Sequence, residues 1–289
     1  MSNPNDDFLQ YVGGYAAEEE NVEELLATSV DPHFADEIPH MMDPRGHELA
    51  GRGFLKMENQ YRQGSCQGQA LTECLEFCFG VEVGKVIQSS RQFAYLVSQK
   101  YSRISGDRGS TLSGGTYCVE KVGICDEEIG PYQSSYPGHG WLKQGMYDNA
   151  KDYKLGSHTS LRSAEEVRAY LGSGMGIVQV GIRWGRSCSP DSKGCIKSYS
   201  SSGGGGHSFV FAGYLPDETV GVKSSRGWWG LIKNSWGSKW GDGGYAYVDP
   251  KCIDTMCRQT VIGRSDMITP VPKVERILDF TVDGNSMYA

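Results

Sequence analysis

The chain of 289 residues has no apolar run approaching the roughly 20 residues of a membrane-spanning helix, so we expect no membrane segment. Its first residues lack the basic and apolar stretches of a secretory signal peptide, which leaves cytosolic, virion-associated or specialised-export settings open. An excess of positive charge is also missing, because the net charge is −7, and this argues against a nucleic-acid-binding surface. Composition is otherwise ordinary for a soluble globular protein, with 38% hydrophobic and 22% charged residues.

Metal-ligand patterns are scarce as well. No Cys-x-x-Cys occurs and the six histidines are scattered, so we expect no metal site and no cofactor. The nine cysteines are an odd number, which leaves at least one free thiol and fits a nucleophile plus up to four pairs. Cys188 with Cys195, and Cys252 with Cys257, are close enough in sequence to close short loops. Reduced, buried thiols are the alternative.

The hydrophobic pattern changes along the chain. Helical spacing of apolar residues predicts helices over 66–79 and 91–101, and a capping box at Ser163 predicts a short helix ending at 171. A long polar loop is expected over 183–206. Four strands are expected over 177–182, 207–214, 228–234 and 244–248. Helices early and antiparallel strands late indicate an α+β protein in two lobes.

Four polar residues supply the parts of a cysteine acyl-transfer site. Cys66 stands at the start of the first expected helix, where the helix dipole favours a thiolate. His207 opens a strand and could take and return a proton, and Asn234 at a strand end could orient its ring. A side-chain amide at Gln60 could donate to an oxyanion.

These segments together resemble the papain/cathepsin family of cysteine peptidases, as a distant member. The resemblance rests on Gly64-Ser65-Cys66, Gly206-His207-Ser208 and Asn234-Ser235-Trp236-Gly237. It implies a papain-like fold with a helical N-terminal lobe, an antiparallel β lobe, and an active site between the two.

The family places its oxyanion glutamine six residues before the nucleophile, and two frames compete here. Counting from Gln63 leads to Gln69, which would give an inactive protein, whereas counting from Gln60 leads to Cys66. The second frame also aligns Gly-Ser-Cys with the family pattern, and His207 then follows Cys66 by 141 residues, within the expected range. The resemblance therefore assigns Cys66 as nucleophile, His207 as base, Asn234 as orienting residue and Gln60 as oxyanion donor.

The resemblance also suggests substrate contacts. Gly114 and Gly115 match a turn on which a peptide would lie by backbone hydrogen bonding, although a purely structural turn is the alternative. Trp236 would shield the bond between Asn234 and His207 from water, and Trp240 would wall the leaving-group side.

Three positions depart from the family pattern. Gln67 follows the nucleophile where relatives carry Trp, and we expect it to weaken packing at the start of the helix. Gln63 stands where relatives often carry a disulfide-bonded Cys, which removes one covalent link. Gly206 precedes His207 where a small polar residue is common.

The same resemblance implies a domain organisation. We expect an N-terminal extension over 1–37 containing a short helix from Glu18 to Leu26, a peptidase domain over 38–264, and a C-terminal tail over 265–289. Residues 1–37 are too few for the long pro-region typical of the family. Either extension could cover the groove or contact an assembly partner.

The sequence therefore predicts a cysteine endopeptidase acting on peptides or proteins. A cysteine amidase or peptidoglycan hydrolase of the wider clan is the alternative within enzymes. A catalytically silent structural or binding homologue is the alternative outside them.

Overall fold

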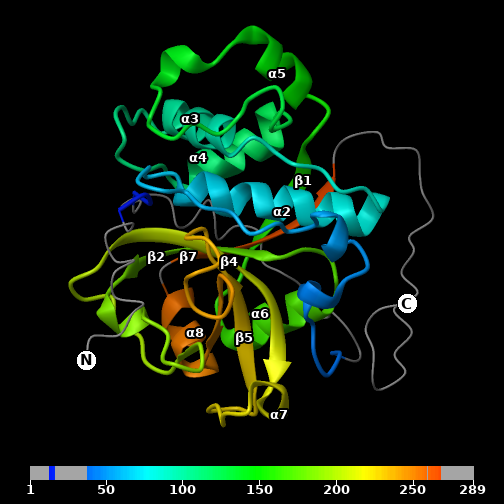
Figure 1. Ribbon diagram of the computed structural model, residues 1–289, viewed down its shortest axis with the longest axis vertical. Coiled ribbons are helices and arrows are strands. Elements are labelled where there is room, and N and C mark those ends of the chain that lie inside the picture. Colours follow the sequence, from blue (N-terminus) through cyan, green and yellow to red (C-terminus); the bar gives the residue numbers. More distant parts are fainter. Residues whose placement is uncertain (1–12, 17–37, 259, 268–289) are drawn as a thin grey trace.

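Two halves of the protein meet along helix α2 in the computed structural model, which describes residues 13–16, 38–258 and 260–267. Figure 1 shows α3, α4 and α5 gathered on one side of α2, and β2, β4 and β5 with α6, α7 and α8 on the other. The helices are α2 (Cys66–Val83), α3 (Arg91–Tyr101), α4 (Leu112–Tyr117), α5 (Gln144–Ala150), α6 (Ala164–Gly172), α7 (Asp217–Val220) and α8 (Pro250–Cys257). This is the α+β architecture that the sequence predicts.

A seven-stranded sheet forms the other half, in the order β1-β7-β2-β4-β5-β6-β3. Neighbouring strands are antiparallel except β3 and β6, which are parallel. The strands are β1 (Leu155–Ser160), β2 (Val178–Trp184), β3 (Cys195–Ile196), β4 (Gly205–Pro216), β5 (Trp228–Lys233), β6 (Tyr245–Val248) and β7 (Thr260–Met267). The adjacency of β4 and β5 places the start of one strand beside the end of the other.

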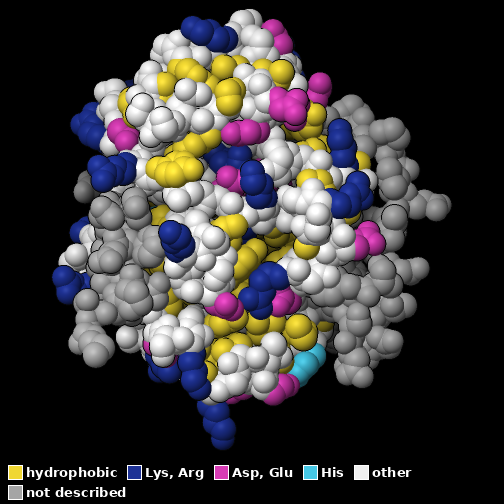
Figure 2. Space-filling view, viewed as in Figure 1, with side chains coloured by type: hydrophobic (Ala, Val, Ile, Leu, Met, Phe, Trp, Pro, Cys, Tyr) yellow, Lys and Arg dark blue, Asp and Glu magenta, His cyan; other side chains and the backbone are white. Residues whose placement is uncertain are grey.

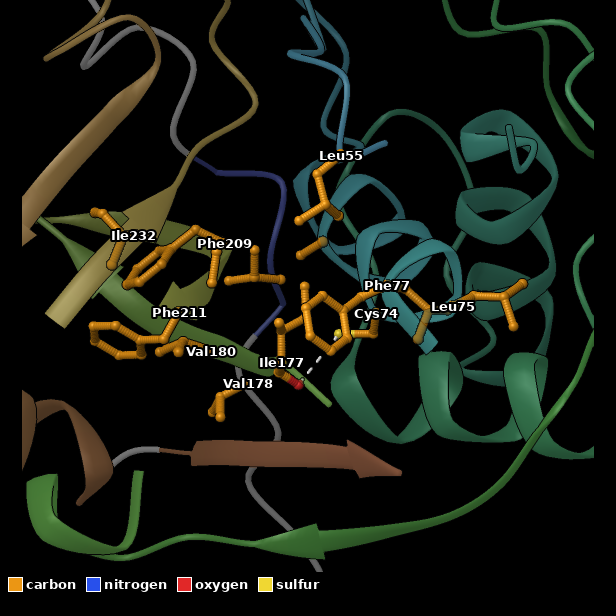
Figure 3. Packing of buried hydrophobic residues seen from close by; sticks show 14 of the residues in the cluster. Leu55, Cys74, Leu75, Phe77, Ile177, Val178, Val180, Phe209, Phe211 and Ile232 are labelled. Atoms are coloured by element: carbon orange, nitrogen blue, oxygen red, sulfur yellow. Dashed lines mark hydrogen bonds between the residues drawn. The ribbon is translucent and has the colours of Figure 1, made fainter. Parts of the chain in front are cut away.

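The core lies between α2 and the sheet. Figure 3 shows Cys74 and Phe77 of α2 facing Ile177 and residues of β2 and β4, such as Phe209. The thiol of Cys74 donates to the carbonyl oxygen of Ile177 at 3.8 Å. Nearly every residue of α2 is buried, so this helix is fixed from both sides and holds its first residue in place.

Several predicted elements agree with the structure. Helix α3 has the predicted bounds, and the hydroxyl of Ser163 caps α6 by accepting from the backbone N–H of Glu166. Helix α2 runs four residues beyond the predicted end at 79. It stops at Gly84, whose left-handed backbone (φ 65°) lets its N–H donate to the carbonyl of Gly80.

Other predictions are corrected. Part of the polar loop over 183–206 is ordered as β3, and β2 and β4 extend into its two ends. The predicted boundary at residue 264 falls inside β7, which lies between β1 and β2 within the sheet. The helix predicted from Glu18 to Leu26 and most of the C-terminal tail lie outside the described residues.

All nine cysteines fall within the described ranges, and each is a buried free thiol. The short-loop pairs that their spacing allows are therefore not formed. No helix in the described part of the chain is both long enough and apolar enough to cross a bilayer. Figure 2 shows acidic and basic side chains interspersed over one face, with apolar side chains visible between them.

Candidate active site

The candidate nucleophile, Cys66, is the first residue of α2 and is completely buried. Burial raises the pKa of its thiol to about 12, although the backbone N–H groups of Ser208, Gln67 and Cys66 itself act in the opposite direction. The contribution of Ser208 shows that the sulfur lies beside the start of β4. The fold therefore brings the helix terminus and the predicted histidine strand together.

His207 is also completely buried, and its Nε2 lies 2.9 Å from Oδ1 of Asn234 at the end of β5. The backbone N–H of Ser235 donates to the same Oδ1 at 2.8 Å, which identifies that atom as an acceptor. The hydrogen of the imidazole is therefore on Nε2, and Nδ1 is the nitrogen that can act as a base. Nδ1 has no hydrogen-bond partner among the described residues.

Burial lowers the pKa of His207 to about 4, and the bond to Asn234 acts weakly against that shift. Both shifts favour the uncharged forms of the Cys66 thiol and the His207 ring.

Aromatic rings enclose the histidine. The ring of Trp236 lies 4.5 Å from that of His207, centroid to centroid, at an interplanar angle of 32°, and Trp184 meets His207 edge-on at 5.3 Å. Trp236 is 2% exposed and covers the face of the His207 ring, and its role as a shield of the Asn234–His207 bond stays a prediction.

Trp240 packs perpendicular to Trp236, with ring centroids 5.6 Å apart, and is completely buried. A wall on the leaving-group side needs exposed surface, which Trp240 does not have. The structure gives Trp240 a supporting position beneath Trp236 instead.

Gln60 joins this cluster through the Asn234 loop. Its backbone N–H donates to the carbonyl of Ser235 at 2.8 Å, and its Oε1 accepts from the hydroxyl of Ser235 at 2.7 Å. With Oε1 committed as an acceptor, Nε2 is the donor end of the amide, and it donates to the carbonyl of Gln63 at 3.0 Å. The loop after β5 thus positions both Asn234 and Gln60.

Two of the residues that depart from the family pattern, Gln63 and Gln67, form side-chain hydrogen bonds in the structure. The amide of Gln63 exchanges hydrogen bonds with that of Gln92 on α3, at 3.1 and 3.2 Å, so a polar pair links the segments where relatives often use a disulfide. Gln67 is completely buried and accepts from the hydroxyl of Ser110 at 2.8 Å. Its buried Nε2 has no hydrogen-bond partner among the described residues, so the expected weaker packing at the start of the helix stays a prediction.

Gly114 and Gly115 do not form the predicted turn, because both lie within α4. An added Cβ would meet the backbone of Ser98 at Gly114 and the amide of Gln67 at Gly115. Their small size serves helix packing here. Just before α4, Ser110 instead pairs with Tyr15 through a short bridge of backbone hydrogen bonds.

The N-terminal segment 13–16 lies against this backbone, beside the start of α2 (dark blue in Figure 1). The N–H of Gly13 donates to the carbonyl of Gly206 at 2.6 Å. The N–H of Ser110 donates to the carbonyl of Gly14 at 3.2 Å, and the N–H of Ala16 donates to the carbonyl of Ser110 at 3.0 Å. The sequence suggests that residues 1–37 could cover the groove, but it does not single out residues 13–16. Their only signal is a Gly-Gly-Tyr run inside an acidic extension.

Within the described ranges, no group of three or more His, Cys, Asp or Glu side chains is placed to hold a metal ion. The chemistry available is that of a thiol, an imidazole, an orienting carboxamide and amide donors. That set is suited to nucleophilic attack on a carbonyl carbon.

Comparison with known proteins points the same way. A family model described as "Papain family cysteine protease" matches residues 38–261. The chain is 25% identical over 204 residues to digestive cysteine proteinase 3 of Homarus americanus, covering 65% of this chain and 56% of that protein. It is 24% identical to procathepsin L of Mus musculus, covering 84% and 69% of the two chains.

The solved structure of xylellain, a cysteine protease from Xylella fastidiosa, superposes with a TM-score of 0.70 at 21% identity, covering 89% of this chain and 97% of that one. The shared fold agrees with the predicted two-lobed architecture. The chain spans less than two thirds of the length of the Homarus relative.

Proposed function

Since the chain belongs to the papain family of cysteine proteases, we propose that it is an endopeptidase that hydrolyses peptide bonds of peptides or proteins through Cys66, His207, Asn234 and Gln60. The observation that carries the proposal is the 2.9 Å bond between His207 and Asn234, which Trp236 shields, together with the contact between the backbone of the next residue, Ser208, and the thiol at the start of α2. We assign to the catalytic domain the residues from 38 to the end of β7 at Met267.

In the first half of the reaction, Nδ1 of His207 takes the proton of the Cys66 thiol, and the sulfur attacks the carbonyl carbon of the substrate. The carbonyl electron pair moves to oxygen, giving a tetrahedral oxyanion. The backbone N–H of Cys66 and the side-chain amide of Gln60 donate to that oxyanion, and one such donor typically lowers the barrier by about 3–4 kcal/mol. Collapse breaks the C–N bond, and His207 gives its proton to the leaving amine.

In the second half, His207 takes a proton from water while the water oxygen attacks the thioester carbon. Collapse of this second intermediate releases the carboxylic acid and returns the thiol. Throughout, Asn234 keeps Nε2 of His207 bonded, so that Nδ1 stays directed to the reacting atoms. The site needs no group beyond these residues and water.

Cleavage of a mixed peptide library, followed by mass spectrometry, tests this proposal. We expect internal cleavage by the wild type and a loss of about 10³-fold or more in Cys66→Ala, because the nucleophile is removed. Cys78→Ala is the matched control, since Cys78 is a buried thiol on the same helix, and it should keep the wild-type rate.

Equal cleavage by Cys66→Ala and the wild type would contradict the assignment. Turnover of muropeptides with no cleavage of any library peptide would replace peptidase activity with cell-wall hydrolysis at the same residues.

A further inference from the structure

Helix α2 begins differently from the other helices that follow a serine or threonine. Ser90 before α3, Thr111 before α4 and Ser163 before α6 each accept a hydrogen bond from a backbone N–H of the first turn. Ser65 holds the same place before α2, yet its side chain makes no such bond. A serine at this position normally satisfies one of the unpaired N–H groups of the helix. The hydroxyl of Ser65 is therefore committed elsewhere.

Tyr132 is the partner of that hydroxyl. The phenolic oxygen of Tyr132 lies 2.6 Å from Oγ of Ser65 and 2.9 Å from the backbone carbonyl oxygen of Gln60. A carbonyl only accepts, so the single phenolic hydrogen goes to Gln60 and the hydroxyl of Ser65 donates to Tyr132. Ser65 and Gln60 are both completely buried, so bulk water does not compete for these bonds. One side chain thus connects the candidate oxyanion donor with the residue just before the candidate nucleophile.

The backbone around Tyr132 is itself held in place by other parts of the chain. The N–H of Tyr132 donates to the carboxylate of Glu127 at 2.8 Å. The side-chain amide of Gln63 donates to the backbone carbonyl of the next residue, Gln133. The segment 131–133 is therefore fixed on both sides of the phenol.

The N–H groups at the start of α2 serve the sulfur of Cys66 instead of a capping oxygen. The backbone N–H groups of Cys66 and Gln67 both act to lower the pKa of that thiol, against the effect of burial. The N–H of Cys66 is also the backbone donor to the oxyanion in the proposed mechanism. If the hydroxyl oxygen of Ser65 turned onto the first turn of the helix, it would compete for these groups.

We propose that Tyr132 is a positioning residue of the active site, which holds the Ser65 hydroxyl away from the start of α2 and fixes the backbone of Gln60. It acts through these two neighbours rather than on the reacting atoms. The proposal rests on the proposed function, because it concerns the nucleophile and the oxyanion donors of that same site.

Tyr132→Phe removes only the phenolic hydroxyl, so it tests the two hydrogen bonds with little change in packing. The oxyanion forms in the transition state and not in the bound substrate, so kcat should fall about tenfold while KM stays within about twofold. Initial rates with one library peptide that the wild type cleaves measure both constants. The rates are divided by the concentration of sites that an epoxide inhibitor titrates, so that a loss of folded protein does not lower kcat.

The rate at which iodoacetamide alkylates Cys66 at neutral pH, followed by peptide mapping, is the second readout and does not depend on turnover. It should fall about fivefold in Tyr132→Phe, because the released hydroxyl of Ser65 then accepts from the first turn of α2 and less thiolate forms. The double variant Ser65→Ala/Tyr132→Phe lacks the competing oxygen and should regain the wild-type rate. Loss of a merely structural contact would not be reversed in this way.

Tyr214→Phe is the matched control. The hydroxyl of Tyr214 also donates to a backbone carbonyl, that of Pro39 at 2.7 Å, and Tyr214 lies toward the opposite end of β4 from His207. This variant should match the wild type in kcat, in KM and in the rate of alkylation.

Unchanged kcat and unchanged alkylation in Tyr132→Phe would overturn the proposal even if the wild type cleaves peptides. Slower alkylation that the double variant does not restore would also overturn it, because the hydroxyl of Ser65 would then not be the cause. Slower alkylation that the double variant restores, without cleavage of any peptide by the wild type, would support the positioning role and remove the proposed function instead.

Discussion

At the residue scale, the buried carboxyl group of Glu76 gives a prediction that a change of pH can test. It is buried in α2 and accepts from the backbone N–H of Ser89 at 2.7 Å. Burial raises the pKa of this carboxyl group to about 8 from an ordinary value of 4.5, despite the opposing charge of Arg91. Between these two values the native state binds more protons than the unfolded state, so stability falls as pH rises through the window.

Glu76→Gln keeps the acceptor for Ser89 and removes the titration. We expect its unfolding free energy to be close to that of the wild type at pH 5. At pH 8.5 the variant should be more stable by roughly 4 kcal/mol, since the pKa rises from 4.5 to about 8 and each pKa unit corresponds to about 1.4 kcal/mol. Urea unfolding at the two pH values measures this.

The exposed Glu128 provides the control, and Glu128→Gln should show no such pH-dependent gain. A stability difference between Glu76→Gln and the wild type that is the same at both pH values would contradict the account.

The sequence identified candidate residues but not their neighbours. Cys66, His207, Asn234 and Gln60 were predicted from segment motifs, and the fold does bring those segments together, while their catalytic roles stay a prediction. The partner of Gln67 could not be predicted, because Ser110 lies far along the chain and no periodic pattern links the two. A glycine pair such as Gly114-Gly115 looks the same in sequence whether it forms a turn or allows close helix packing.

At the scale of elements, a buried ion pair ties α2 to β5. Lys233, the last residue of β5, donates to Glu73 of α2, and their side chains are only 1% and 7% exposed. Lys233 immediately precedes Asn234, so the pair joins the helix that begins at Cys66 to the strand end that holds His207.

Lys233→Met should destabilise the protein by about 3–5 kcal/mol, because it leaves the charge of Glu73 buried and uncompensated. The double variant Glu73→Leu/Lys233→Met should recover most of that loss, since apolar side chains replace both charges. Thermal or chemical unfolding of the single and double variants measures the coupling.

The exposed ion pair between Nζ of Lys151 and Oδ1 of Asp148, 2.8 Å apart, is the control. Lys151→Met should leave the unfolding free energy unchanged within error. If the double variant lost as much unfolding free energy as Glu73→Leu and Lys233→Met lose together, the two charges would not act as a pair.

Elements with strong apolar periodicity, such as α3 and β5, were predicted well. Helix α5 and strand β1 were missed because Gln-Gly-Met-Tyr-Asp-Asn-Ala and Leu-Gly-Ser-His-Thr-Ser carry little periodic signal. Strand β1 exists through its pairing with β7, a contact across about a hundred residues that local pattern does not encode.

For the molecule as a whole, the nine buried free thiols predict a protein without disulfide bonds. Alkylation in denaturant without a reducing agent should add nine labels, because every cysteine is a free thiol. Intact mass spectrometry counts them. Fewer than nine labels, restored to nine by a reducing agent, would show disulfides and contradict the structure.

The central claim is that Cys66 is the nucleophile of the active site and that His207 activates it. Treatment of the wild type and Cys66→Ala with an epoxide inhibitor of cysteine peptidases, followed by peptide mapping, tests it most directly. We predict one adduct in the wild type, on Cys66, and none in Cys66→Ala. An adduct on another cysteine, or none in the folded wild type, would contradict the account.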